Sequence, residues 1–214
     1  MFCQHGFGRN DAICFRSFLD IINTDLFASK PRNQIHMHHR QLSLCFDSFH
    51  NLCGLNDADT DRAVAAFREY FPDKGLFENE VYPGIPALLA HLKSEGKRLF
   101  VATSKLDTMA ERILEHFGLA PYFDAICGAP EGDKEAGKKV NVVKAALKAA
   151  GCDDLSRAVM VGDREHDVIG AHLAGLDVIG VLYGYGSREE LTAAGADQIA
   201  ETPEALETLI LSTN

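Results

Sequence analysis

The sequence predicts an α/β fold in which a parallel sheet is covered by helices on both faces. From about residue 85 onward, short apolar runs alternate with longer segments whose apolar residues recur at helical spacing. Short polar or glycine-containing loops join these segments. Strands that alternate with helices in this way form parallel sheets with a helical layer on each side. No internal repeat or low-complexity stretch interrupts the pattern.

The composition limits the class of protein. With 214 residues, 46% hydrophobic and 24% charged, the chain suits one globular domain or a core domain with a small insert. No apolar run approaches the roughly 18 residues of a membrane-spanning helix, and no leader-like pattern follows Met1, so we expect a cytoplasmic protein. The net charge of −10 argues against non-specific nucleic-acid binding. The six cysteines contain no Cys-x-x-C pair, which disfavours a zinc knuckle and suggests a reducing compartment.

Residues 1–46 are the least regular part of the chain. The segments 12–15 and 18–22 each predict either a short strand or part of a helix. Residues 29–41 have no apolar period and predict a loop. Because this pattern is broken, we expect no well-packed central strand from the region. The loop carries three histidines without a Cys or acidic partner at ligand spacing, so a polar loop is preferred over a metal site: His36, His38 and His39.

From Asp47 the chain becomes regular. Asn56 begins a set of helix-start residues, and one apolar face follows until Pro72. Beyond residue 81 we predict helices over 85–92, 107–117 and 143–150, with an N-cap at Asp107, and a further helix whose apolar residues run from Val168 up to a C-cap at Gly175. Strands are predicted over 99–102, 122–128, 159–161 and 178–182.

The central strand of this pattern, 159–161, ends in Gly162 and is followed at once by Asp163, with Asp167 four positions on. Ligands bind at the carboxyl edge of open α/β sheets, and two carboxylates there suit Mg²⁺. The alternative is a surface loop with two solvated acids. The residues between the two acids, 164–166, are expected to face solvent.

A second polar group follows the strand over 99–102. Thr103 would face the same edge of the sheet as Asp163, where its hydroxyl could donate to a phosphate oxygen, with Ser104 and the amides of the next helix beside it. The alternative is that these hydroxyls cap the helix that follows.

Three stretches carry a resemblance to a known family: VMVGDREHDVIGAHLAG, DVIGVLYGYGSREEL and AGADQIAETPEAL. They closely resemble the haloacid dehalogenase-like (HAD-like) phosphatases, in particular the phosphoglycolate phosphatase-like and 5′-nucleotidase-like branch. The resemblance runs from about Asp47 to Leu209. It implies a Rossmann-like core with a small helical cap, divided into an atypical segment 1–46, part of the cap over 47–80 and the core over 81–214.

The resemblance also implies roles for individual residues. Asp163 and Asp167 would hold Mg²⁺, while Thr103 and Ser104 would bind phosphate. A lysine just before the helix at 143–150 would neutralise the phosphate, and the family spacing favours Lys139 over its neighbours Lys138 and Lys134. The alternative for these lysines is a solvated basic turn. The implied reaction is Mg²⁺-dependent hydrolysis of a small phosphorylated metabolite, with phosphoglycolate as the first candidate and a nucleoside 5′-monophosphate as the second.

One family motif is not found. The family's first strand ends in Asp-x-Asp-Gly-Thr, whose first Asp attacks phosphorus and whose second acts as acid and base. Residues 1–46 contain no Asp-x-Asp; the closest stretch, 18–25, has acids at the wrong spacing. The nucleophile is therefore unassigned, and we expect little or no phosphatase activity from this chain. A frameshift, a misassigned start or another sequence error before Asp47 is one explanation. The other is true divergence to a non-catalytic phosphate-binding or interaction protein.

Overall fold

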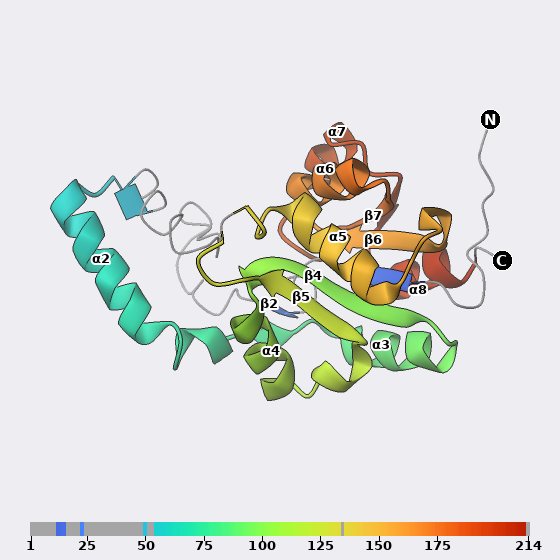
Figure 1. The fold of residues 1–214 in the computed structure, drawn as a ribbon, viewed down its shortest axis with the longest axis horizontal. Coiled ribbons are helices and arrows are strands. Elements are labelled where there is room, and N and C mark those ends of the chain that lie inside the picture. Colours follow the sequence, from blue (N-terminus) through green and yellow to red (C-terminus); the bar gives the residue numbers. More distant parts are fainter. Residues whose placement is uncertain (1–11, 16–21, 24–48, 51–53, 134, 213–214) are drawn as a thin grey trace.

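The computed structural model describes residues 12–15, 22–23, 49–50, 54–133 and 135–212. Its centre is a six-stranded sheet in the order β5-β4-β1-β6-β7-β8 (Figure 1), and all the strand pairs in it are parallel. The predicted parallel α/β core is thereby confirmed. Its strands are β1 (Ala12–Phe15), β4 (Arg98–Leu106), β5 (Ala125–Ala129), β6 (Ala158–Gly162), β7 (Asp177–Val181) and β8 (Gln198–Ala200).

The N-terminal region supplies a strand at the middle of this sheet. β1 pairs with β4 on one side and β6 on the other, so that Phe15 is opposite both Val101 and Val161. The expectation that residues 1–46 provide no central strand is therefore wrong. A central strand of a parallel sheet is a short, continuous apolar run, and four such residues carry no periodicity by which to recognise them.

Two helical layers cover the sheet and divide its core into two clusters. Leu99 and Val101 pack with the apolar faces of α3, α4 and α8, whereas Phe100 and Ala102 pack with α5, α6 and α7. This alternation shows that β4 is buried on both faces, because successive side chains of a strand point to opposite sides of the sheet. In Figure 1, α3 and α4 lie below the sheet and α5, α6 and α7 above it. The helices are α3 (Ile85–Ser94), α4 (Asp107–His116), α5 (Lys139–Ala150), α6 (Glu165–Ala174), α7 (Arg188–Ala193) and α8 (Pro203–Leu211), with single 3₁₀ turns at Ala120–Tyr122 and Leu155–Arg157.

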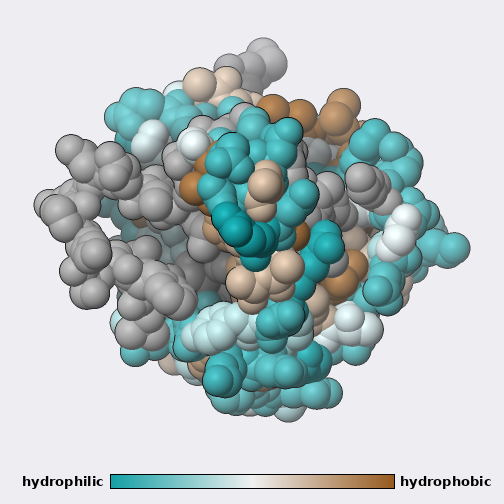
Figure 2. Space-filling model, turned by 90° about the vertical axis from the view of Figure 1, so that its left-hand side faces the viewer, coloured by the Kyte–Doolittle hydropathy of each residue, from teal (hydrophilic) through white to brown (hydrophobic). Residues whose placement is uncertain are grey.

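The remaining described elements lie between the N-terminal strand and α3. Helix α2 (Asp57–Tyr70) projects away from the sheet (Figure 1), and Figure 2, which looks at this end of the molecule, shows mostly hydrophilic residues on the described surface. Phe71, just after α2, stacks on Phe67 at 4.8 Å between ring centroids and joins the cluster beneath the sheet. A 3₁₀ turn (Gly75–Phe77) follows, and β3 (Glu80–Val81) pairs antiparallel with β2 (Ile22–Asn23). The division into cap and core near residue 81 stays a prediction.

Asp124 ties the lower helical layer to the sheet. Its carboxylate accepts a hydrogen bond from the Leu99 amide at 2.8 Å and pairs with Lys93 of α3 at 2.8 Å. Burial by itself would raise the pKa of Asp124, but the hydrogen bonds from Lys93 and from the amide outweigh it, so the pKa lies below its usual value. Within the described ranges, no helix is both long and apolar enough to cross a bilayer.

Candidate active site

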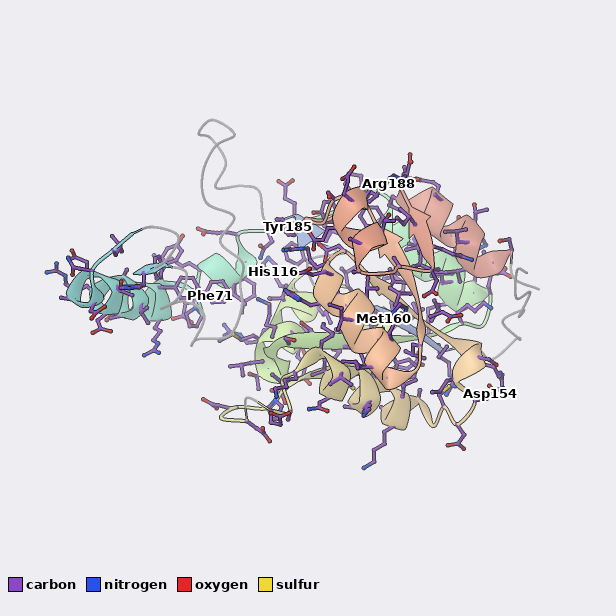
Figure 3. All side chains as sticks on the ribbon, turned by 90° about the horizontal axis from the view of Figure 1, so that it is seen from above. Phe71, His116, Asp154, Met160, Tyr185 and Arg188 are labelled. Carbon is purple, nitrogen blue, oxygen red and sulfur yellow. The ribbon has the colours of Figure 1, made fainter. Side chains whose placement is uncertain are left out.

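The residues selected from the sequence lie on β4, just after β6, and on the helices α5 and α6. Asp163 directly follows β6, Thr103 lies in β4 one residue beyond Ala102, and the loop 182–187 follows β7. Since β4, β6 and β7 run parallel, these positions belong to the carboxyl edge of the sheet. Figure 3 places Tyr185, in the β7 loop, at the end of the core that faces Phe71, and Asp154, ahead of β6, at the opposite end.

Lys139 and Asp167 form a buried ion pair at this edge. The Lys139 Nζ lies 3.6 Å from the Asp167 Oδ1 and donates a hydrogen bond of 3.0 Å to the Ala102 carbonyl. The Lys139 side chain is 9% exposed and that of Asp167 is fully buried. Gly170 of α6 makes this packing possible, because a Cβ there would lie 2.7 Å from the Lys139 Cβ and closer still to its Cγ.

A second candidate lysine, Lys138, does not take part in this cluster. Lys138 is exposed and pairs with Glu135 at 2.6 Å, three residues earlier. Lys134 lies outside the described residues, as do His36, His38 and His39. The geometry thus favours Lys139 as the lysine of the site. Lys138 fits the alternative, a solvated basic turn.

Asp163 is fully buried and is enclosed by the loop after β7. Its Oδ2 accepts a hydrogen bond of 2.7 Å from the Tyr185 amide. A Cβ at Gly184 would lie 2.5 Å from that oxygen, and a Cβ at Gly186 would overlap the Asp163 carbonyl oxygen. No role for this loop was predicted from the sequence. The available signal was the alternation Tyr183-Gly-Tyr-Gly, since glycine is required where backbone approaches another group closely.

Asp167 also closes the first turn of α6. Its Oδ2 accepts the Arg164 amide at 2.9 Å, and Gly162 leaves room for it, because a Cβ at Gly162 would lie 2.5 Å from the Asp167 Cβ. One oxygen of Asp167 therefore holds the backbone of the turn, while the other faces Lys139. The surface-loop alternative for the two acids is wrong, because both carboxylates are buried.

The expectation that residues 164–166 face solvent is wrong for Arg164. Its side chain is 19% exposed, and its Nε donates to the Glu190 Oε1 of α7 at 2.6 Å. The same oxygen accepts the Glu165 amide at 3.0 Å. Burial by itself would raise the pKa of Glu190, but the hydrogen bonds from Arg164 and from the amide prevail, and the pKa lies below its usual value. Glu190 was not selected from the sequence because it is remote from the motif along the chain.

Thr103 is buried, and its Oγ1 accepts the Lys105 amide at 3.2 Å. The N-cap of α4 is Leu106, which makes no side-chain cap bond, and Asp107 is the first helical residue. Both the capping alternative for Thr103 and the predicted cap at Asp107 are therefore wrong. Ser104 is half-buried beside Thr103, in the stretch where the register of β4 against β5 shifts. Bulges of this kind are frequent next to active sites.

The donor set fits Mg²⁺ in part. Two buried carboxylates follow one strand, and hard oxygen donors are the ligands that Mg²⁺ takes together with water and substrate oxygens. Asp167 is more engaged by protein groups than Asp163, so Asp163 is the better candidate for direct contact. Across the described ranges, this site included, no group of three or more His, Cys, Asp and Glu side chains gathers at metal-binding distance.

Comparisons with known proteins connect this site to a family. A 5′-nucleotidase of Pseudomonas aeruginosa is 41% identical over 140 residues, covering 65% of this chain and 62% of that protein. The tyrosine-protein kinase PtkA of Mycobacterium tuberculosis is 44% identical over 134 residues (62% and 45%), and a phosphoglycolate phosphatase of Caulobacter vibrioides is 36% identical over 141 residues (63% and 57%). Each match thus spans less than two thirds of the relative's own length.

A solved structure extends the likeness to nearly the whole chain. A predicted phosphatase from Clostridium acetobutylicum superposes with a TM-score of 0.75 at 35% identity, covering 94% of this chain and 98% of that one. The family model for haloacid dehalogenase-like hydrolases matches residues 19–181, so the likeness begins well before Asp47, where the motifs alone had placed its start. On this evidence, the chain belongs to the haloacid dehalogenase-like hydrolases.

Proposed function

We propose that the carboxyl edge of the sheet binds the phosphoryl group of a small phosphomonoester together with Mg²⁺, and that the reaction of the site is hydrolysis of that ester. The observation that carries the proposal is the burial of Lys139, Asp163 and Asp167 at one edge beside Thr103. Phosphoryl transfer depends on positioning and on charge stabilisation around the phosphoryl oxygens, and these are the groups it requires.

Each residue has a distinct role in this proposal. Asp163 is the principal protein ligand of Mg²⁺, which when bound neutralises charge on the phosphoryl oxygens. Lys139 supplies a fixed positive charge, held in place by Asp167 and the Ala102 carbonyl. Thr103 and Ser104 donate hydrogen bonds to phosphate oxygens. Asp167 acts mainly through Lys139 and the Arg164 amide rather than by touching the substrate.

We propose phosphoglycolate as the first substrate and a nucleoside 5′-monophosphate as the second. Two of the relatives, a phosphoglycolate phosphatase and a 5′-nucleotidase, support these choices. The segment 47–80 is proposed as part of a helical cap that selects between them. We place the protein in the cytoplasm, in agreement with the composition.

The position of β1 bears on which residue could act as the nucleophile. β1 ends at Phe15, and the sequence continues Arg16-Ser17-Phe18, where the family motif has Asp-x-Asp. The next carboxylate in the sequence is Asp20. This observation favours the second candidate function, a homologue that binds phosphate without hydrolysing it efficiently.

Hydrolysis assays separate the two functions. Turnover of an aryl phosphate, phosphoglycolate and adenosine 5′-monophosphate with Mg²⁺ should be very low for the chain as it stands, since loss of a nucleophile commonly costs several orders of magnitude. The double variant Arg16→Asp/Phe18→Asp should gain activity, whereas the matched control Arg16→Asn/Phe18→Asn should not. Sequencing of the coding region for residues 1–50 checks whether Asp-x-Asp-Gly-Thr lies in a neighbouring frame.

Two results would contradict these proposals. Substantial turnover by the unaltered chain that disappears in Asp163→Asn would show that another acid, with Asp20 the leading candidate, serves as nucleophile. Failure of the Asp/Asp variant to gain activity, combined with failure of the unaltered chain to bind inorganic phosphate or Mg²⁺, would reject a phosphoryl-transfer site altogether.

A further inference from the structure

The loop that follows β7 makes three separate approaches to one residue, Asp163. The Tyr185 amide donates to its Oδ2, Gly184 lies against its side chain, and Gly186 lies against its main-chain carbonyl. We propose that the loop 183–186 is a positioning element that fixes the orientation of the Asp163 carboxylate, and that Gly184 is the residue on which this depends. The proposal rests on the proposed role of Asp163 as a metal ligand.

The contact at Gly184 is directed at the carboxylate itself. An added Cβ would lie 2.5 Å from Oδ2 and 2.7 Å from Cγ of Asp163, both within the distance at which one of the groups must move. Asp163 is fully buried and follows a strand that is paired on both sides, so its backbone has little room to yield. A methyl group at Gly184 should therefore displace the loop or turn the carboxylate.

The hydrogen bond from Tyr185 explains why displacement of the loop matters. At 2.7 Å it is a short amide–carboxylate bond, and such bonds to a charged acceptor are stronger than neutral ones. This bond fixes the position of one carboxylate oxygen of Asp163 and therefore the orientation of the carboxylate group. Groups that orient a metal ligand from outside the coordination sphere commonly change metal affinity about 10- to 100-fold when they are altered.

The loop is also supported from its other end. The Tyr183 ring packs edge-to-face on Tyr82 at 5.7 Å between centroids, and both rings lie against the core cluster below the sheet. Tyr82 follows β3 directly, ahead of α3. The loop is therefore held at Tyr183 by ring packing and at Tyr185 by the bond to Asp163, with Gly184 as the link between them.

Magnesium affinity tests the proposal without an activity assay. Titration calorimetry with Mg²⁺ should show binding to the unaltered chain and binding weakened by about tenfold or more in Gly184→Ala. The matched control is Gly180→Ala in β7, where an added Cβ would lie 3.0 Å from the flexible end of the Leu191 side chain and 3.5 Å, an ordinary contact distance, from the Cβ atoms of Leu191 and Ala196. In addition, the Tyr185 amide resonance should shift on Mg²⁺ addition, and that shift should be absent in Asp163→Asn.

A second measurement works without metal and also if Gly184→Ala folds poorly. The loss of thermal stability caused by Gly184→Ala should be much smaller in an Asp163→Gly background, where the side chain it overlaps is gone. Additive effects of the two substitutions, or Mg²⁺ affinity equal in Gly184→Ala and the unaltered chain, would overturn the positioning role. Absence of Mg²⁺ binding by the unaltered chain would instead overturn the proposed function, and the stability comparison would still decide how the loop acts on Asp163.

Discussion

Replacement of Lys139 by methionine tests the buried ion pair between α5 and α6. Methionine keeps the unbranched apolar stem that packs against Gly170 and removes only the ammonium group. In the folded chain that group faces the Asp167 carboxylate at 3.6 Å and donates to the Ala102 carbonyl at 3.0 Å. The substitution therefore leaves a fully buried carboxylate without its cation.

The expected cost follows from the geometry. Breaking a buried pair by removing one partner typically costs 3–5 kcal/mol, because a buried charge loses its compensation. Here the pair is long, and Asp167 retains its bond from the Arg164 amide, so we expect the low end, about 3 kcal/mol. Since natural domains have about 5–15 kcal/mol of stability in total, this is a large fraction. For a chain of this length it corresponds to a fall in Tm of about 6–12 °C.

Urea unfolding followed by circular dichroism at neutral pH gives the measurement. The midpoint should fall while the slope with urea stays the same, which is the sign of a change in stability alone. Lys138→Met is the matched control, since that lysine is exposed and pairs with Glu135 three residues earlier, and its effect should stay within about 0.5 kcal/mol.

A double-mutant cycle gives the decisive comparison. Asp167→Asn should also destabilise, but Lys139→Met/Asp167→Asn should be more stable than the sum of the two single changes predicts, by about 2 kcal/mol. Additivity within about 0.5 kcal/mol would show that Lys139 and Asp167 do not interact, and the assignment of Asp167 as the group that holds Lys139 would be refuted.

Three further predictions concern other parts of the structure. The contribution of Asp124, whose folded pKa is depressed, should be present in full above the pKa of about 4 that an unfolded Asp has and should be lost as pH falls through the lower folded pKa. In urea titrations, Asp124→Asn should therefore cost about 1 kcal/mol at pH 7 and progressively less as pH falls below about 4. Gly170→Ala should destabilise by about 1–2 kcal/mol, because overlap with the Lys139 side chain outweighs a helix-propensity gain of about 1 kcal/mol; a rise in Tm would contradict this. Asn56→Ala should remove the side-chain bond to the Asp59 amide and cost α2 about 1 kcal/mol, visible as faster amide exchange in its first turn and not in α6.

The sequence predicts the core well because its strands and helices are marked by local patterns. The run 159–161 followed by Gly162 identifies β6, and the apolar face that ends in Gly151 identifies α5; both agree with the structure to within a few residues. A strand over 12–15 was one of the two alternatives that the sequence left open, and the structure confirms it. Its central place was not predicted, because four apolar residues carry no period and that place is set by pairing with strands far along the chain.

In the candidate site, too, the features set by local sequence could be predicted, and those set by residues far along the chain could not. Asp163 and Thr103 are found from the sequence because each follows a recognisable strand. The environment of Arg164 could not be predicted in this way, because the polar stretch around it is typical of a surface loop and its partner Glu190 is distant along the chain. The position of the loop 183–186 likewise depends on its contact with Asp163, and no local pattern describes a contact of that kind.

The central position of β1 has a consequence for synthesis on the ribosome. β1 is made before the other described strands, yet its partners begin 86 residues later at Arg98 and 146 residues later at Ala158. At roughly 5–20 residues per second, the second partner follows about 7–30 s after β1. Because β4 and β6 are joined in the sheet only through β1, the nascent chain cannot close its sheet before β6 has emerged. Early binding of a chaperone to the segment that contains β1 would thus delay closure of the sheet.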